Sequence, residues 1–391
     1  MDRVANPYTP NAGAMPPALV GRDQMFEDFR VLLARVAAGA DDKGFLVTGL
    51  RGVGKTVLLN RFKTMAEAEG AVVVFHEIVR IGTPFPIRFA ALCRRALYEI
   101  SPRGRWRQRA VEAAGIIKSF SIGVDPSGTL GVGFDVEAAT GMADSGDLSL
   151  DLADVVVALG RAAADHDTSI VFLLDEIQYL DSAELSALVI AKHQINQQRL
   201  PIVFSGAGLP QLPALTGEAQ TYAERMFSFP EIGALDVAEA TAALLEPAEA
   251  LGVTYAPEAA NYIIEYTEGY PFFIQEFGKA VWNEAKPPSI TMEDAQAAER
   301  QVEEVLDQDF FAVRTDPLPD SERAYVKALA SLGPGEHTPG QIAKILGKKS
   351  SSAIGSTATR LIERGLVYRS RRGQVAFTVP HFDRYVMRTF P

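Results

Sequence analysis

Cysteine is almost absent from this sequence, since Cys93 is the only one among 391 residues. A lone cysteine excludes an internal disulfide, so we expect an apolar core to hold the fold and the protein to work in a reducing compartment. Long apolar runs are missing as well, because no stretch approaches the roughly 20 residues that a membrane-spanning helix needs. The N-terminal segment, Met1 to Pro7, has no apolar signal core. These absences predict a cytoplasmic protein without a membrane partner.

Positive charge is scarce in most of the chain and concentrated at its C-terminal end. The net charge of −11 at pH 7 argues against a uniformly basic surface that binds nucleic acid. Residues 321–391 nevertheless hold 12 Lys and Arg against 4 Asp and Glu, so this segment carries +8 and the remainder −19. Such asymmetry indicates a module that faces nucleic acid, attached to an acidic body.

The length of 391 residues predicts two or three domains. Between residues 20 and 235, apolar runs alternate with helical stretches, which is typical of a three-layer α/β domain with a mostly parallel sheet. We expect its strands at 44–48, 71–77, 169–174 and 201–205. The other parts are a lead-in rich in Pro, Asn and Gly (1–19), a helical domain (236–312), a linker (313–320) and the basic module (321–391).

An insertion interrupts the α/β pattern at about 116–135. Two apolar arms, 116–123 and 129–134, flank a turn at 125–128 that contains Pro and Gly. This arrangement predicts a β-hairpin, to which the sequence assigns no function.

The segment Gly49–Thr56 fits the phosphate-binding pattern G-x-x-x-x-G-K-[ST] at every fixed position. It follows a short apolar strand and precedes a helix with an apolar face, a context that a simple glycine turn with a surface lysine would not need. Backbone N–H groups at such a helix N-terminus form an anion site. Lys55 offers a charge to the β- and γ-phosphates, and Thr56 offers a hydroxyl to Mg²⁺. The residues expected to hold the nucleotide here are Gly49, Arg51, Gly52, Val53, Gly54, Lys55, Thr56 and Val57.

Two carboxylates, Asp175 and Glu176, end the apolar strand that starts at Ser169. Ligands bind at the C-terminal ends of buried parallel strands, so Asp175 is expected to hold Mg²⁺ and Glu176 to polarise the attacking water. The alternative is a strand end engaged in a surface ion pair. The next strand ends, by its pattern, at Ser205, whose hydroxyl is expected to reach the γ-phosphate or the water; a plain turn is the equal alternative.

These motifs make the chain resemble the AAA+ and STAND groups of P-loop ATPases, most closely the branch with origin-recognition-type initiators and archaeal ATPases. The resemblance runs from Leu19 to the C-terminus and implies ATP and Mg²⁺ as ligands, with ATP hydrolysis as the activity. It implies that Val20, Gly21 and Arg22 border the adenine. It also makes Ser205 a sensor, and it implies that Pro271, in Gly269-Tyr-Pro271 of the helical lid, packs near the base.

The same resemblance implies that Arg225 is an arginine finger, which such proteins commonly supply to a neighbouring subunit, and therefore that the chain self-associates through the ATP site. Simpler alternatives stay open for these segments: a turn at Val20–Arg22, a solvated arginine at 225 and a helix boundary at Gly269–Pro271.

Two positions depart from the initiator pattern. No arginine follows Pro271, where initiators carry a second lid sensor, and Gln178 replaces the acidic residue usual two positions after the catalytic glutamate. The first departure favours slow hydrolysis and a STAND-like switch, in which ATP and ADP hold different domain arrangements.

The C-terminal module has the pattern of a winged helix, with helices at 339–346 and 354–364 and a hairpin with a basic tip at 366–378. If it binds duplex DNA, its second helix enters the major groove and the wing contacts phosphates. The residues expected at DNA are Ser350, Ser351, Ser352, Ser356, Thr357, Arg360, Arg369, Arg371 and Arg372. The alternative is a protein-docking or autoinhibitory module. The sequence thus leaves two hypotheses, an ATP-dependent DNA-binding protein and a signalling switch with a protein partner.

Overall fold

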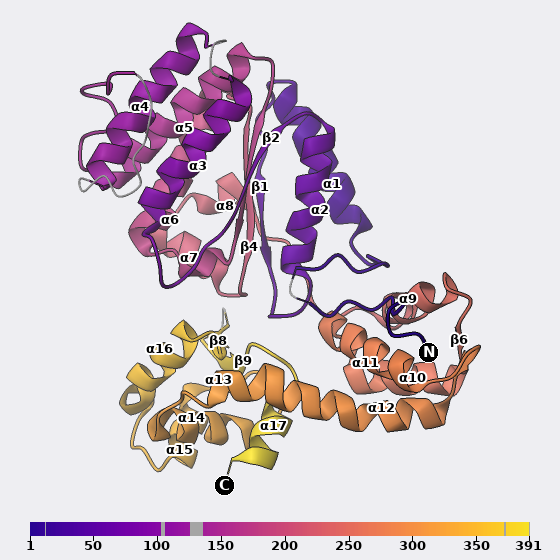
Figure 1. The fold of residues 1–391 in the computed structure, drawn as a ribbon. Coiled ribbons are helices and arrows are strands. Elements are labelled where there is room, and N and C mark those ends of the chain that lie inside the picture. Colours follow the sequence, from indigo (N-terminus) through magenta and orange to yellow (C-terminus); the bar gives the residue numbers. More distant parts are fainter. Residues whose placement is uncertain (12, 103–105, 126–135, 371–372, 391) are drawn as a thin grey trace.

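Five parallel strands form the sheet at the centre of the N-terminal half (Figure 1). The computed structural model describes residues 1–391 apart from 12, 103–105, 126–135, 371–372 and 391. The strand order is β2-β3-β4-β1-β5. The strands are β1 (Gly44–Thr48), β2 (Val72–Glu77), β3 (Ile170–Asp175), β4 (Ile202–Gly208) and β5 (Phe227–Ser228). The four expected strands are therefore confirmed, whereas the short β5 was not predicted.

Helices cover both faces of this sheet, so the expected three-layer arrangement is confirmed. In Figure 1, α1 (Asp23–Ala37) and α2 (Lys55–Ala68) lie on one face, and α3 (Phe85–Ile100), α5 (Leu148–Asp165) and α6 (Ser182–Gln197) lie on the other. Every residue of β3 and β4 is buried, which explains their nearly uninterrupted apolar sequences. Stacked phenylalanines fill the two interfaces: Phe29 on Phe62 on one side, and Phe172 between Phe89 and Phe204 on the other.

The β-hairpin expected at 116–135 is wrong in its first arm. Residues 116–123 lie within the helix α4 (Gln108–Val124). Ala110, Ala113, Ile117 and Phe120 are buried at helical spacing, so burial of one helix face outweighs the strand preference of the two isoleucines. The second arm, 129–134, lies outside the described residues.

Two short helices, α7 (Leu212–Ala219) and α8 (Ala223–Met226), connect β4 to β5. A helical region follows, with α9 (Val237–Glu249), α10 (Pro257–Thr267), α11 (Pro271–Glu284) and α12 (Met292–Val305), and with a small parallel pair of β6 (Thr254–Tyr255) and β7 (Ser289–Ile290). The lead-in packs against this region. The buried Tyr8 donates its hydroxyl to the Leu244 carbonyl at 2.5 Å, and the Met1 ammonium donates to the Ala285 carbonyl at 2.7 Å.

Half of the linker expected at 313–320 is helical. α12 continues into the π-helical segment η2 (Leu306–Ala312) and then into α13 (Val313–Thr315), and α14 already begins at Asp320. The burial of Phe311 and Thr315 explains why the helix does not stop earlier. Only 316–319 connect, a stretch that contains Pro317 and Pro319.

The C-terminal module contains α14 (Asp320–Ala330), α15 (Pro339–Ile345), η3 (Ser351–Ile354), α16 (Gly355–Glu363), an antiparallel pair of β8 (Val367–Arg369) and β9 (Val375–Phe377), and α17 (Phe382–Thr389). The two helices and the hairpin occur where the sequence predicts them, and α17 is an addition. In Figure 1 this module lies below the loop that follows β1. In the described part of the chain, no helix is both long and apolar enough to cross a membrane.

Candidate nucleotide site

The loop Gly49–Thr56 joins β1 to α2 and turns its backbone toward the start of the helix. Gly54 occupies the N-cap position of α2 with a φ of 95°, a left-handed conformation that is strained for other residues. The N–H groups of the first helical turn have no partner within the helix. The local sequence therefore builds an anion-binding helix N-terminus at Lys55 and Thr56.

Lys55 is buried, and its ammonium donates to the carbonyl oxygens of Gly49 and Leu50 at 3.0 and 2.8 Å. Burial lowers the pKa of Lys55, while the charges of Glu176 and Asp175 act in the opposite direction. An anion held against this ammonium would restore the charged form, so the residue fits a phosphate ligand.

Asp175 is the last residue of β3 and is buried beside the loop. The Thr56 hydroxyl donates to Asp175 Oδ2 at 2.5 Å, and the Glu176 backbone N–H donates to Oδ1 at 2.8 Å. Burial raises the pKa of Asp175, so a cation would stabilise its charged form. A carboxylate and a hydroxyl are the oxygen ligands that Mg²⁺ prefers. No group of three or more His, Cys, Asp or Glu in the described residues could hold a metal, so an ion here would also need phosphate oxygens or water.

Glu176 has a φ of 55°, which is uncommon outside glycine, and its side chain is held by Gln178. The Gln178 amide nitrogen donates to Glu176 Oε2, and its amide oxygen accepts from the Leu209 backbone N–H at 3.1 Å. Gln178 thereby ties Glu176 to the end of β4. In the sequence, Gln178 stands out only as a departure from a family pattern. No local signal predicts its hydrogen bonds to Glu176 and Leu209.

The expected position of Ser205 at the end of a strand is wrong. β4 continues to Gly208. Glycine is the residue that fits at position 206 of this strand, because a Cβ there would lie 2.3 Å from the Leu174 carbonyl oxygen. Ser205 is buried within the sheet, and its hydroxyl accepts from the Phe45 backbone N–H at 3.1 Å. The hydroxyl is engaged between strands, which does not fit a role at the phosphates.

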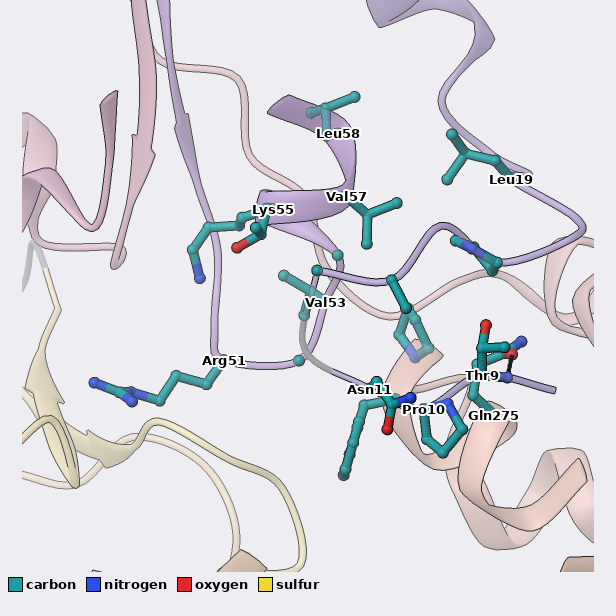
Figure 2. Close-up of a pocket in the computed structure, with 18 of the residues that line it drawn as sticks. Thr9, Pro10, Asn11, Leu19, Arg51, Val53, Lys55, Val57, Leu58 and Gln275 are labelled. Carbon is teal, nitrogen blue, oxygen red and sulfur yellow. Dashed lines mark hydrogen bonds between the residues drawn. The ribbon is translucent and has the colours of Figure 1, made fainter. Parts of the chain in front are cut away.

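A cavity of about 410 Å³ lies beside the loop (Figure 2). This volume is in the range of sites for small-molecule ligands, roughly 300–1,000 Å³. Figure 2 shows the lead-in residues Thr9, Pro10 and Asn11 across the cavity from Val53 and Val57, with Thr9 N–H bonded to Gln275 of α11 at 3.0 Å. The lead-in was not predicted to take part in the site. The described lining also includes Arg22, Arg51, Gly52, Gly54, Lys55, Thr56, Glu176 and Pro271.

Among the residues expected near the adenine, Val20, Arg22 and Pro271 line this cavity, whereas Gly21 does not; Gly49 of the phosphate-binding loop does not line it either. The Arg22 guanidinium donates to the carbonyl oxygens of Gly21 and Gly233 at 2.8 and 3.1 Å. Gly49 donates its backbone N–H to the Gly208 carbonyl at 3.2 Å. These contacts join the segment before α1 and the start of the loop to neighbouring backbone.

Comparison with known proteins accords with this geometry. Residues 18–204, which contain β1 to β3, the loop and Glu176, match the AAA ATPase domain. This segment is an AAA+ P-loop ATPase domain. Residues 308–386 match a domain of unknown function. No curated protein matches the sequence.

Solved structures share the fold at low sequence identity. The chain is similar to the Walker-type ATPase of Pyrococcus abyssi, with 13% identity, a TM-score of 0.53, and coverage of 94% of this chain and 96% of that one. It is more distantly similar to the Aeropyrum pernix Orc1 protein in complex with DNA, with 15% identity, a TM-score of 0.46 and coverage of 96% and 94%. The Thermotoga maritima RuvB Holliday junction branch migration motor gives 16% identity, a TM-score of 0.43 and coverage of 95% and 96%.

The AAA+ domain contacts the C-terminal module directly at the phosphate-binding loop. The Arg51 backbone N–H donates to the Thr378 carbonyl at 3.1 Å, and the Arg51 guanidinium donates to the Tyr179 hydroxyl at 2.6 Å. The helical region contacts the same loop, because Phe272 N–H donates to the Gly52 carbonyl at 3.2 Å and the Tyr270 hydroxyl donates to the Arg51 carbonyl. Three parts of the chain thus meet at one loop.

Four arginines of the C-terminal module form ion pairs within the chain. The buried Glu322 accepts a hydrogen bond from Arg360 at 2.7 Å and forms an ion pair with Arg364 at 2.9 Å. Arg384 pairs with Glu268 of the helical region, and Arg388 pairs with Asp307 of η2, both at 2.8 Å. Arg360, which was expected to face DNA, therefore has a structural partner.

Other residues expected at DNA are accessible. Ser350, Ser351, Ser352, Ser356 and Arg369 are exposed, Thr357 is half-buried, and Arg371 and Arg372 lie outside the described residues. Sequence reasoning did not single out Lys344, Lys348 and Lys349, which are also exposed around the turn between α15 and α16. These three lysines and Ser350–Ser352 are called the basic turn below. Arg225 is exposed on α8 and does not line the cavity.

Proposed function

We propose that this chain is an ATP-binding and ATP-hydrolysing switch, in which the nucleotide state of the Gly49–Thr56 loop sets the position of the C-terminal module. The hydrogen bond from Arg51 N–H to the Thr378 carbonyl carries the proposal. This donor belongs to the loop whose backbone would surround the phosphates. Phosphate binding by this loop and its hydrogen bond to Thr378 therefore compete for the same segment of backbone.

The chemistry that the chain would supply follows from the buried charges of the site. Lys55 would leave the Gly49 and Leu50 carbonyls and bind the β- and γ-phosphates. Thr56 and Asp175 would hold Mg²⁺, which supplies positive charge to the phosphate oxygens. Glu176 would orient the attacking water and accept its proton, with Gln178 fixing the carboxylate.

A further contact between the AAA+ domain and the C-terminal module is an exposed ion pair. Arg80, in the segment after β2, pairs with Glu363 of α16 at 2.9 Å, and both side chains are about half exposed (48% and 49%). Exposed ion pairs of this kind contribute about 0–1 kcal/mol each. This contact therefore opposes a change in the position of the module only weakly, which favours a switch.

Energy transfer between two labels tests this function. Cys93 is fully buried, so cysteines introduced at Arg95 of α3 and Lys344 of α15 would take the labels. We expect different transfer efficiencies with ATP and with ADP, because the module changes position. A pair at Arg95 and Lys63, both within the AAA+ domain, is the control and should not change. Equal efficiencies in all states, with ATP shown to bind, would contradict the switch.

Duplex DNA is the second candidate partner, and the basic turn is the observation that favours it. The two helices and the hairpin of the module are consistent with a winged helix, and the turn places exposed lysines and serines before α16. In a winged helix that binds DNA, the helix after this turn enters the major groove. The contacts proposed here are Lys344, Lys348, Lys349 and Ser350–Ser352, with Ser356, Thr357 and Arg369 beside them.

Replacing Lys348 and Lys349 with alanine should weaken binding to duplexes of every sequence. The slope of log K against log salt concentration is negative, and each lost phosphate contact reduces its magnitude by about 0.9. Salt-titrated binding of a mixed-sequence duplex measures both effects. The matched control is the double variant Lys279→Ala and Lys286→Ala, which removes the same charge from exposed positions in the helical region. Equal losses in the two double variants would mean that the basic turn is not the contact.

Self-association through the nucleotide site completes the proposal. Arg225 is exposed and does not line the cavity of its own chain, so it would act on the nucleotide of a second copy. Sedimentation in the presence of ATP measures this, and a monomer at all protein concentrations would contradict it.

A further inference from the structure

Two guanidinium groups beside the nucleotide cavity, those of Arg51 and Arg314, have no acidic partner in the part of the chain that the structure describes. Arg51 belongs to the phosphate-binding loop, and Arg314 lies on α13, within the helix that runs from the helical region to the C-terminal module. Both residues line the cavity. Within the described residues, no carboxylate lies within ion-pair distance of either guanidinium, and Asp309, which also lines the cavity, does not pair with Arg314.

Arg314 is held in place without being neutralised. Its guanidinium carbon lies 4.0 Å from the centre of the Phe310 ring, and one terminal nitrogen donates to the Phe310 carbonyl. Within the described residues the other donors of the fork make no hydrogen bond, so they can bind a further ligand. Burial, and to a smaller extent the charge of Arg51, lower the pKa of Arg314 to about 10. Two half-buried arginines of like charge therefore line the same cavity.

Arg51 has an unsatisfied donor in the same region. One terminal nitrogen donates to the Tyr179 hydroxyl, but Nε is buried and has no hydrogen-bond partner. A buried donor without a partner costs about 1–3 kcal/mol. Figure 2 shows the Arg51 side chain extending from the loop toward the C-terminal part of the chain, away from the lead-in side of the cavity.

We infer that Arg314, together with Arg51, binds the terminal phosphate of ATP. This inference rests on the proposed nucleotide site. An anion would relieve the repulsion between the two guanidiniums and satisfy their free donors, and phosphate matches the fork of arginine in a bidentate geometry. Lys55 and Glu176, the groups that would act on the terminal phosphate, line the same cavity. The two arginines thus share one cavity with the groups that would act on the terminal phosphate.

The contact at Arg314 has a direct connection to the C-terminal module. Its neighbour Thr315 is buried, and the Thr315 hydroxyl lies 3.0 Å from the Tyr385 hydroxyl of α17. Arg323 of α14 donates to the Thr315 carbonyl at 3.1 Å. A displacement of Arg314 toward a phosphate would therefore move residues that hold α14 and α17, which specifies how the switch would sense ATP.

The test compares the affinities for ATP and ADP of the full chain and of Arg314→Met, using fluorescent analogues of the two nucleotides. We expect the variant to lose about 10- to 100-fold in ATP affinity, which corresponds to hydrogen bonds to a charged group. ADP affinity should change less than about twofold, because ADP lacks the contacted phosphate. Arg314→Lys should recover part of the loss, since it keeps the charge without the fork. Arg300→Met, an exposed arginine on α12, is the matched control.

The outcomes separate this inference from the proposed function. Parallel losses for ATP and ADP, or none, in Arg314→Met overturn the inference while leaving the nucleotide site intact. If the original chain binds neither nucleotide, the proposed function fails first. If Arg314→Met unfolds, Arg51→Met provides the same comparison. Inorganic phosphate is the last arm: if it alone stabilises the original chain but not Arg314→Met, and the ratio of ATP to ADP affinity is unchanged, the site takes free phosphate and the inference is wrong.

Discussion

Replacing Lys55 with alanine should abolish ATP binding, with an expected loss of at least about 100-fold in affinity, because a buried ammonium makes charge-assisted hydrogen bonds to phosphate. Lys55 now donates to two carbonyls of its own loop, so its ammonium is already directed to the centre of the loop. Isothermal titration or a fluorescent ATP analogue measures the loss. The same loss is expected for ADP, because the β-phosphate is common to both nucleotides.

Lys63 provides the matched control for this variant. It lies on the same helix, α2, but its side chain is 43% exposed and its partner is Glu67 at 3.8 Å. Lys63→Ala should bind ATP as the original chain does. ATP affinity preserved in Lys55→Ala would show that the loop does not hold phosphates, and would remove the basis of the proposed function.

Replacing Glu176 with glutamine should stop turnover while ATP still binds. General-base catalysis contributes about 10²–10⁴-fold to a rate, and glutamine keeps the shape of the side chain without accepting a proton. We expect hydrolysis to fall by at least about 100-fold and ATP affinity to change less than about threefold. Single-turnover hydrolysis, with binding measured in parallel, separates the two effects.

Glu77 is the control for this second variant. It is exposed at the end of β2 and pairs in register with Asp175 of β3, so it is a carboxylate at the same C-terminal end of the parallel strands. It does not line the cavity. Glu77→Gln should hydrolyse ATP at the original rate. Undiminished turnover in Glu176→Gln would assign the catalytic role to another group.

The sequence predicts those parts of the fold that depend on short, contiguous patterns. The loop Gly49–Thr56 and the strands β1 to β4 are of this kind, because an apolar run and a fixed motif are legible without knowledge of the rest of the chain. The end of β4 was misplaced because Gly206 and Gly208 resemble a turn. Close packing against β3, rather than a change of direction, explains the glycine at 206.

Such local patterns do not predict contacts between residues that lie far apart in the sequence. Nothing near Arg51 indicates that its N–H meets Thr378, and nothing near Arg360 indicates that its charge is used by Glu322. The charge balance of residues 321–391 was a correct count, but it could not show which arginines pair with acidic residues of the same chain. The interaction between Gln178 and Glu176 was missed for the same reason, since it depends on the backbone of Leu209.

In the proposed switch, the hydrogen bond between Arg51 and Thr378 makes nucleotide binding and release of the C-terminal module reciprocal. If ATP lowers the affinity of the module for the loop by some factor, the docked module lowers ATP affinity by that same factor, and a partner that draws the module away raises ATP affinity by up to that factor. A partner need not be known in advance to be detected. Its binding will appear as a change in ATP affinity, so titration with ATP can serve as the assay in a search for it.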